Sequence, residues 1–452
     1  MSQSQSRFHR RTLVSIGSLS FFAFLYTCIL LYPLYRQHIP KALLPPATSY
    51  PAGREGLELC SGMDHSPAWS FNKTRDERAY GLNTEQCHAA FPGLFADIGR
   101  AMEYRKSSSN YMIEEDIDIS WKQDGAVRAA ILDQQLYIRD TRLSGSNHET
   151  PRILAILHAL HRAIITSPVP LPDIEFSFTT SDIADPEHLQ KTIWALSRTV
   201  DEKEKWLMSD FGFWSWPLSL VGGYEQIRLQ ISETELGFNS KKRQAIWRGA
   251  LRTNKHREDL LRVTEGKYWA DVKAVEWSTA TEPKISNGAS PVSMPEHCQY
   301  QFLIHTEGRS YSGRGKYLQN CNSVVIMPKR NWIEPHHSLL VSAGPDQNFV
   351  EVEEDFSDLE PRILELLGDP EKSQRIAQNG VDTFRDRYLT PAAQACYWRQ
   401  LILGWAEVSF VPKALMTSSG QYSRGEPFET FVIQKAMAIS SCSWMSRLFS
   451  YC

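Results

Sequence analysis

The sequence has few cysteines, no excess of charge of one sign and no internal repeat at solenoid spacing. Its 8 cysteines in 452 residues are too few for a small disulfide scaffold, and they show neither a C-x-x-C pair nor a Cys/His cluster at zinc spacing. Lys and Arg number 49 against 52 Asp and Glu, a formal net charge of -3, which argues against a general nucleic-acid binder. With 42% hydrophobic and 22% charged residues, the composition is that of a folded multi-domain protein and is typical of an enzyme.

Charged residues are also missing from the mostly apolar stretch 12–35, between Arg11 and Arg36. A helix of this length reaches about 36 Å, enough to cross a bilayer core of about 30 Å. The alternative is a cleaved signal peptide, but the stretch is longer than such an apolar region and no Ala-x-Ala site follows it. The excess of arginine before the span favours a cytoplasmic N-terminus. The sequence therefore predicts a single-pass type II membrane protein of the Golgi or endoplasmic reticulum, with residues 1–11 cytoplasmic and a luminal body.

Two further features agree with a luminal body. Asn72 begins an Asn-Lys-Thr glycosylation sequon, which is accessible only on the luminal side. Seven cysteines follow the predicted span, and in the lumen they can oxidise. Because seven is odd, at least one is free or pairs with another chain. The chain ends without a C-terminal retrieval tetrapeptide.

The order of predicted elements indicates an α/β fold. Residues 36–84 are expected to form a stem, since residues 36–70 are rich in Pro, Gly and Ser. Strands and helices then alternate, which favours Rossmann-like domains with parallel sheets, and residues 411–452 form a tail without clear periodicity. The predicted strands are 174–180, 300–305 and 323–327, and the predicted helices are 153–165, 355–367, 370–388 and 391–409.

A glycine-rich loop from Gly308 to Lys316 is the first candidate site. It lies between a predicted strand and a predicted helix, and it carries the cations Arg309, Arg314 and Lys316. Glycine lets backbone N–H groups approach a phosphate, and arginine binds phosphate oxygens in pairs. The loop matches neither the Walker pattern nor G-x-G-x-x-G, so an ordinary solvated loop stays an alternative.

Three other segments could carry chemistry. Arg248 and Arg252 lie at a predicted strand-to-turn transition, where the alternative is a solvated basic face. Asp182 would lie at the carboxyl edge of a strand, where α/β sheets bind ligands, although a helix N-cap or a turn aspartate fits the position too. Trp214, Ser215 and Trp216 form an aromatic segment that could stack on a sugar or a peptide, or belong to the core.

Asp116 and Asp118 form a D-x-D triplet that competes with these segments. Such a triplet holds a divalent ion against the diphosphate in metal-dependent sugar transferases. Here it precedes a strand-like stretch instead of following one, and D-x-D is frequent by chance.

Taken together, the segments over about residues 85–410 resemble glycosyltransferase family 90, the family of fungal capsule-associated transferases and animal protein O-glucosyltransferases. The matching pieces occur in order: QCHAAFPGLF (86–95), ALHRAI (159–164), LPDIEFSFTTSD (171–182), FGFWSWP (211–217), IWRGA with R-x-x-L (246–260), GRSYSGRGKYL (308–318), CNSVVI (321–326), and DFSDLEPRI through ACYW (355–398).

This resemblance implies a GT-B fold, in which two Rossmann-like domains face each other across a cleft. Residues 85–240 would hold the acceptor and residues 241–410 the nucleotide sugar. It also implies an inverting, metal-independent transfer from a UDP-sugar, with no cofactor and with Asp182 as the general base. The donor-binding residues would be Arg248, Gly249, Arg252, Gly308, Arg309, Ser310, Tyr311, Ser312, Gly313, Arg314 and Lys316, with Arg314 on the diphosphate and Trp214, Ser215 and Trp216 on the acceptor side.

The resemblance further implies a disulfide between Cys298 and Cys321, and one from Cys396 to either Cys60 or Cys87. Because the family's peptide-recognition regions are not matched, we expect a glycan or glycoprotein acceptor. The predicted function is transfer of xylose or glucose from a UDP-sugar to a hydroxyl group. The alternatives are a metal-dependent transferase that uses Asp116 and Asp118, and a non-catalytic carbohydrate-binding relative.

Overall fold

The computed structural model describes residues 69–143, 148–184, 192–216, 218, 221–277, 283–284, 290–416 and 422–435. The chain divides into residues 1–66 and 67–452, and all described residues belong to the second part. The predicted span 12–35 and Cys60 therefore lie outside them. None of the helices found in these ranges is long and apolar enough to cross a membrane.

A six-stranded sheet has the order β17-β2-β1-β3-β4-β5. Its first pair is a hairpin that turns at Asp133 and Gln134, both with positive φ (50° and 64°), as two-residue hairpin turns require. β17, β2, β1 and β3 pair antiparallel, whereas β3, β4 and β5 pair parallel. The strands are β1 (Ala126–Leu132), β2 (Gln135–Arg142), β3 (Ile174–Thr179), β4 (Trp194–Ala195), β5 (Trp206–Leu207) and β17 (Glu426–Pro427).

The predicted strand 174–180 is confirmed as β3, and all six of its residues are buried. The alternating polar residues do not face solvent, because each has a partner. Glu175 accepts from Arg128 at 2.6 Å and pairs with Arg139, and the hydroxyl of Ser177 donates to the carbonyl oxygen of Ile117. β3 is therefore a central strand that ends just before Asp182.

Helices α4 (Ala96–Ser107), α5 (Glu149–Ile165) and α12 (Pro391–Ala406) contribute to the same core as this sheet. Trp405 of α12 donates from Nε1 to the carbonyl oxygen of Glu175 at 2.9 Å, and its ring packs edge-on against Trp194 and Trp206. The sequence grouped residues 391–410 with the second domain, and the packing of α12 corrects that assignment. Periodicity predicts a helix but not the sheet on which its apolar face rests.

The tail also returns to this sheet. β17 pairs with β2, and Phe428 and Phe431, in the helical residues 428–435, are buried in the same core. The expected separate tail from residue 411 is therefore wrong for residues 426–435. A two-residue strand carries too little pattern to be found in a sequence.

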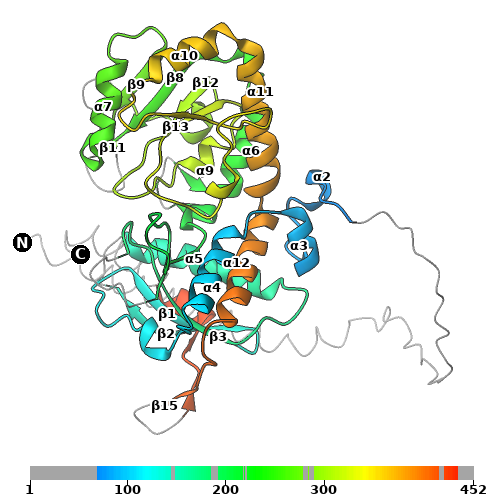
Figure 1. The fold of residues 1–452 in the computed structure, drawn as a ribbon. Helices are drawn as coiled ribbons and strands as arrows, with labels where there is room; N and C mark the ends of the chain where they lie inside the picture. The colour runs from blue at the N-terminus through cyan, green and yellow to red at the C-terminus, as the bar shows by residue number, and fades with distance from the viewer. Residues whose placement is uncertain are drawn as a thin grey trace, which may run out of the picture. The chain divides into compact units, whose positions relative to one another are not determined.

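The second sheet has five parallel strands in the order β14-β13-β12-β8-β9. Figure 1 shows β8, β9, β12 and β13 together with α7, α10 and α11, and β1 and β3 with α4, α5 and α12. The carboxyl ends of parallel strands meet at one edge, where α/β sheets bind ligands. The strands are β8 (Lys242–Gly249), β9 (Ala270–Ala274), β12 (Tyr300–Ile304), β13 (Val324–Pro328) and β14 (Val350–Val352).

The predicted strands 300–305 and 323–327 are thus confirmed, as are the helices around this sheet. The long predicted helix 370–388 is α-helical to Gly380 and then π-helical over Val381–Tyr388. The helices are α6 (Tyr224–Thr234), α7 (Lys255–Thr264), α8 (Met294–His297), α9 (Gly315–Leu318), α10 (Leu359–Gly368) and α11 (Pro370–Gly380).

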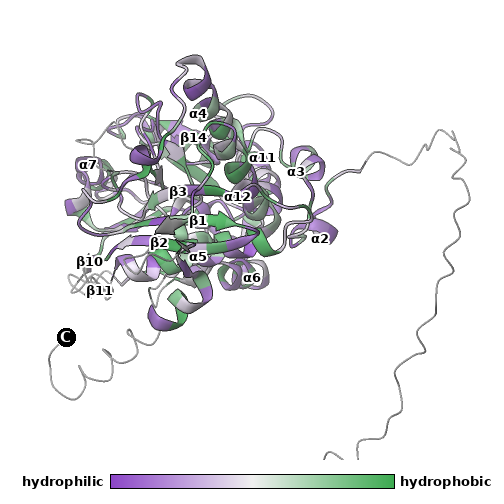
Figure 2. Cartoon of the chain, turned by 90° about the horizontal axis from the view of Figure 1, so that it is seen from below, coloured by the Kyte–Doolittle hydropathy of each residue, from purple (hydrophilic) through white to green (hydrophobic). Residues whose placement is uncertain are grey.

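Two short helices precede the first sheet, α2 (Lys73–Asp76) and α3 (Thr84–Ala90). A disulfide between Cys87 and Cys396 joins α3 to α12, which decides between the two expected partners of Cys396. Figure 2 shows hydrophobic residues at β1 of the first sheet, whereas the outlying α2 is hydrophilic. Asn72 caps α2 and is exposed, so the sequon is open to solvent. The short strand pairs are β6 (Ser215–Trp216) with β7 (Gly222–Gly223), β10 (Glu276–Trp277) with β11 (Pro283–Lys284), and β15 (Leu415–Met416) with β16 (Tyr422–Ser423).

Candidate active site

The glycine-rich loop follows β12 and leads into α9 at the carboxyl edge of the second sheet. The N–H of Gly308 donates to the carbonyl oxygens of Ser310 (2.9 Å) and Tyr311 (3.2 Å), which closes the loop tightly. A Cβ at Gly308 would lie 2.8 Å from the carbonyl oxygen of Tyr311, and one at Gly313 would lie 2.8 Å from the ring of Trp216. Both positions therefore need glycine because other groups approach the backbone closely.

This loop is fastened to the first sheet and to the segment 210–216. Ser310 is fully buried, and its hydroxyl donates to the carbonyl oxygen of Asp182. The hydroxyl of Tyr317 donates to the carbonyl oxygen of Gly212 at 3.0 Å. The hydroxyl of Tyr311 donates to Asp210, and burial together with that carboxylate raises the pKa of Tyr311 well above its usual value. The two sheets thus meet at the loop.

Lys316 has a structural partner. Its side chain is fully buried, and its ammonium lies 2.6 Å from a carboxylate oxygen of Asp210 and donates to the carbonyl oxygen of Gly313 at 2.6 Å. The sequence suggested Lys316 as a donor-binding cation. In the structure its charge is already neutralised, so it holds the loop in place. Asp210, which sequence reasoning missed, is the buried partner on the side of the first sheet.

Arg314 of the loop and Arg257 next to it have no carboxylate partner among the described residues. Burial and the charge of Arg257 lower the pKa of Arg314 to about 9. Burial likewise lowers the pKa of Arg257 to about 10, and this side chain donates to the carbonyl oxygens of Glu307 (3.0 Å) and Ala250 (2.9 Å). Two cations close together in a buried site repel each other and lower the stability of the fold, and an anion bound between them would offset that repulsion.

The other predicted cations differ in their surroundings. Arg248 is buried at the end of β8 and pairs with Asp271, whose carboxylate lies 2.8 Å from its guanidinium. Arg252 and Arg309 are exposed. Arg257, not Arg252, is the arginine that lies beside Arg314. Sequence reasoning did not single it out, although it is the arginine of the R-x-x-L motif.

A pocket of about 60 Å³ brings Arg248, Gly249 and Arg314 together. These three residues come from the two segments that the sequence placed at the donor. The rest of the lining is apolar except for one histidine, and consists of Val221, Val275, Pro291, Val292, Met294 and His297. The pocket can therefore accept a ligand with an anionic end and a flat apolar part.

Asp182 lies in a bend after β3, and 44% of its side chain is exposed. Arg152 of α5 places its guanidinium 3.4 Å from the carboxylate and stacks over the ring of Phe211 at 4.8 Å. With the backbone of Asp182 held by Ser310, the carboxylate is oriented by α5 and by the glycine-rich loop. A solvent-accessible carboxylate in this setting can accept a proton from a hydroxyl group.

The aromatic segment is partly used for packing. The ring of Trp214 stacks on His158 of α5, with centroids 5.2 Å apart, and Arg162 lies 4.5 Å from the same ring. Trp216 packs edge-on against Phe211 at 5.2 Å and touches Gly313. Ser215 and Trp216 form β6, and both Trp side chains stay partly exposed. Trp216 therefore supports the glycine-rich loop from the side of the first sheet.

The D-x-D carboxylates are engaged in local turns. Asp116 accepts from the N–H of Ile113 at 2.9 Å, and Asp118 accepts from the N–H (3.1 Å) and hydroxyl (2.6 Å) of Ser120. The segment precedes β1 at the first sheet. This arrangement resembles the capping of a short 3-10 turn more than a metal site.

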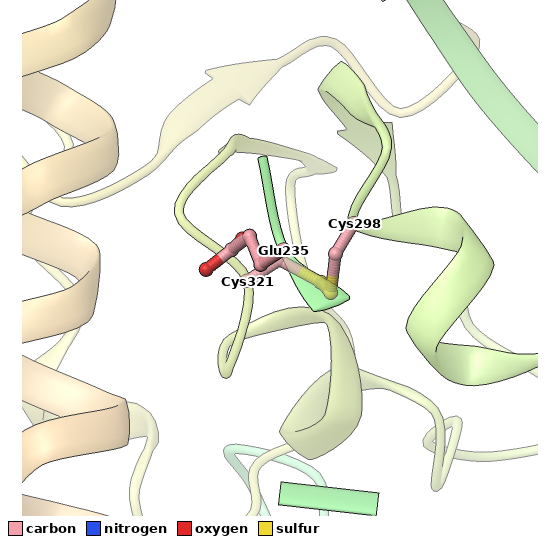
Figure 3. Close-up of side chains that lie close together, drawn as sticks. All are labelled: Glu235, Cys298 and Cys321. Carbon is pink, nitrogen blue, oxygen red and sulfur yellow. A yellow bond between two sulfur atoms is a disulfide. The ribbon is translucent and has the colours of Figure 1, made fainter. Parts of the chain in front are cut away.

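Two other groups of side chains have the proximity that a metal needs, within the ranges that the structure describes. In the first, Glu235 lies beside Cys298 and Cys321 (Figure 3). Those cysteines form the expected disulfide, so they offer no thiolate. Glu235 instead pairs with Lys241 (2.6 Å).

The second group is Glu334, His336 and His337, all close together and with little exposure. Nδ1 of His337 accepts from the N–H of Glu334 at 3.2 Å, so Nε2 carries the proton and faces the Glu334 carboxylate at 3.2 Å. A protonated Nε2 is not a metal ligand. Burial lowers the pKa of His336 and of His337 to about 3.

Comparisons with known proteins relate the chain to glycosyltransferases. The family profile described as "Glycosyl transferase family 90" matches residues 85–414. "O-glucosyltransferase rumi" of Drosophila pseudoobscura pseudoobscura is 22% identical over 79% of this chain and 91% of its own. "O-glucosyltransferase LpsA" of Dichelobacter nodosus is 29% identical over 32% of this chain and 43% of its own, so the chain spans less than half of that relative.

Among solved structures, the C-terminal domain of a "Glycosyl Transferase Group 1 Family Protein (LpcC)" from Francisella tularensis matches 38% of this chain and 93% of its own. Its TM-score is 0.23 and its sequence identity 13%. A similarity of this size carries no argument about the fold.

Proposed function

The chain belongs to glycosyltransferase family 90, and we propose that it transfers a sugar from a UDP-sugar to an acceptor hydroxyl group with inversion at the anomeric carbon. The observation that carries the proposal is the pocket at the carboxyl edge of the second sheet. It is lined by Arg248, Gly249 and Arg314, and the adjoining loop holds the backbone of Asp182 through Ser310.

Arg314 and Arg257 are proposed to stabilise the departing diphosphate. Cleavage of the bond between the anomeric carbon and the diphosphate oxygen leaves negative charge on UDP, which fixed cations stabilise in place of a metal ion. Both guanidinium groups are held beside the glycine-rich loop, and neither has a carboxylate partner in the described part of the chain. Metal independence and the absence of a cofactor follow from this proposal.

Asp182 is the proposed general base. It would take the proton from the acceptor hydroxyl while that oxygen forms a bond to the anomeric carbon on the face opposite UDP. The carboxylate is open to solvent on one side and bound to Arg152 on the other. That exposure supports an acceptor that arrives from solution, and we propose a glycan or glycoprotein.

The two sheets with separate hydrophobic cores support a GT-B arrangement, in which the acceptor binds on the side of the first sheet and the donor on the second. The exposed sequon at Asn72 and the two disulfides support a luminal body in the Golgi or endoplasmic reticulum, with residues 12–35 as the membrane anchor. No specific observation favours a non-catalytic or metal-dependent relative.

The test is to incubate the purified chain with UDP-glucose, UDP-xylose and other UDP-sugars, and to measure the release of UDP. UDP-glucose comes first because the relatives are named O-glucosyltransferases. We expect release from one sugar, faster with acceptor and, below donor saturation, about 10- to 150-fold slower in the variant Arg314→Ala. Equal background release from every sugar, unchanged in that variant, would contradict the proposal.

A further inference from the structure

His297 is the one polar residue of the pocket that is not an arginine, and its ring nitrogens have different surroundings. The residue is 2% exposed and ends α8. Nδ1 lies 2.8 Å from the carbonyl oxygen of Ser293, which can only accept, so Nδ1 carries the proton. Nε2 therefore has a lone pair, and it is buried without a hydrogen-bond partner in the described residues.

The surroundings keep this imidazole neutral. Burial, with the charges of Arg314 and Arg248 contributing, lowers the pKa of His297 to about 4. The next residue, Cys298, is bonded to Cys321, and a capping box of Ser293 and Glu296 closes the first turn of α8. The ring is thus held rigidly by groups on both sides. A buried acceptor that stays unpaired is costly, and it marks a place where a ligand can supply a donor.

The lining of the pocket limits what that ligand is. Val221, Val275, Val292 and Met294 offer apolar surfaces for a flat ring, and the arginines offer a place for an anion. The volume of about 60 Å³ is several times what one water needs. A nucleotide has both an anionic end and a flat ring. Uracil carries a donor at its imide N3–H, whereas N3 of cytosine has a lone pair that would oppose the lone pair of Nε2.

We propose that Nε2 of His297 accepts the N3–H of the donor's uracil, and that this contact selects uridine over cytidine nucleotides. The inference rests on the proposed function, because it assumes that the nucleotide of the donor binds in this pocket. His297 is then a residue that determines base specificity and takes no part in the transfer itself.

The experiment measures binding of UDP, CDP and N3-methyl-UDP to the full-length chain by calorimetry, in the wild type and in two variants. His297→Asn keeps an amide N–H near the position of Nδ1 but has no atom at Nε2. His297→Gln is longer and can present its carbonyl oxygen near Nε2. His88→Asn, at an exposed histidine of α3, is the control. Melting temperatures show whether each variant is folded.

In the wild type we expect CDP and N3-methyl-UDP to bind about 5- to 150-fold more weakly than UDP, the effect of one unpaired buried group. His297→Asn should abolish this preference, His297→Gln should keep part of it, and His88→Asn all of it. UDP binding with a preference that His297→Asn leaves unchanged would overturn the inference and leave the proposed function standing. Absence of binding of every nucleotide to the wild type would overturn both.

Discussion

Removing one charge of the buried pair Asp210 and Lys316 should strongly destabilise the fold, although neither side chain is available to a ligand. The two charges lie 2.6 Å apart with side-chain exposures of 2% and 0%. Asp210→Asn preserves shape and can still accept from the N–H of Gly212, which lies 2.6 Å from the wild-type carboxylate. The neutral amide oxygen stays beside the ammonium of Lys316, but the negative charge that neutralises this buried ammonium is lost.

Removing one partner of a buried ion pair costs about 3–5 kcal/mol, because the other charge stays buried and uncompensated. The double variant Asp210→Asn/Lys316→Met removes both charges, so we expect it to recover most of this loss. Because Asp210 also accepts from Tyr311, both variants should also loosen the glycine-rich loop and slow the release of UDP from the donor.

Urea denaturation followed by fluorescence gives the unfolding free energies, and the double-mutant cycle gives the coupling between the two residues. The control is Glu353→Gln, which breaks the pair with Lys329 at 2.7 Å, where both side chains are half exposed or more. That change should leave the denaturation midpoint nearly unaltered. If Asp210→Asn destabilises no more than the control, or if the double variant is no more stable than the single one, the assignment of a buried pair is wrong.

The remaining predictions concern the site and its pH dependence. Asp182→Asn should fold and keep its affinity for UDP but lose at least about 10²-fold in transfer rate; near wild-type transfer at saturating substrates would leave the base elsewhere. Arg314→Ala should weaken UDP binding about 10- to 150-fold by calorimetry, whereas the exposed Arg309→Ala should have a smaller effect. Excess EDTA should leave transfer intact, and a loss that manganese restores would contradict a cation-based diphosphate site. The folded pKa of His336 is about 3 against about 6.5 unfolded, so its contribution to stability is present above pH 6.5 and lost toward pH 3. The pKa of Glu334 is raised from 4.5 to about 7, so its contribution to stability is present below pH 4.5 and lost as the pH rises to about 7. His336→Phe should therefore make the free energy of unfolding depend less on pH between about 3 and 6.5. An unchanged pH dependence of this free energy would refute the burial argument.

Local sequence patterns were enough to predict three strands of the two sheets, β3, β12 and β13, and the long helices α5, α10, α11 and α12. β3, β12 and β13 have short apolar runs bounded by turn residues, and α5 has a helical apolar stripe. The glycines of the loop 308–316 were expected to let a phosphate approach the backbone, and that stays a prediction; in the structure the carbonyl oxygen of Tyr311 approaches Gly308 and the ring of Trp216 approaches Gly313. The predicted strands and helices depend on neighbours within about ten residues, and such neighbours are visible in a sequence.

The partners of the charged groups were not predictable in the same way. Lys316 pairs with Asp210 across 106 positions of the chain and Arg248 with Asp271 across 23, so two of the expected donor-binding cations turned out to have acidic partners. Arg257 was overlooked although its motif was recognised. Which sheet α12 packs against was likewise decided by Trp405 and its contacts with Trp194 and Trp206.

The sequence by itself determined the strands β3, β12 and β13, the long helices α5, α10, α11 and α12, the family, and the segments that meet at the candidate site. Only the tertiary structure decided which of their side chains are free to act. The reason is that the cost of a buried charge or lone pair depends on what other parts of the chain bring to it. A carboxylate neutralises Lys316, whereas in the described part of the chain Arg314 has no carboxylate partner and Nε2 of His297 has no hydrogen-bond partner, and both residues line one pocket.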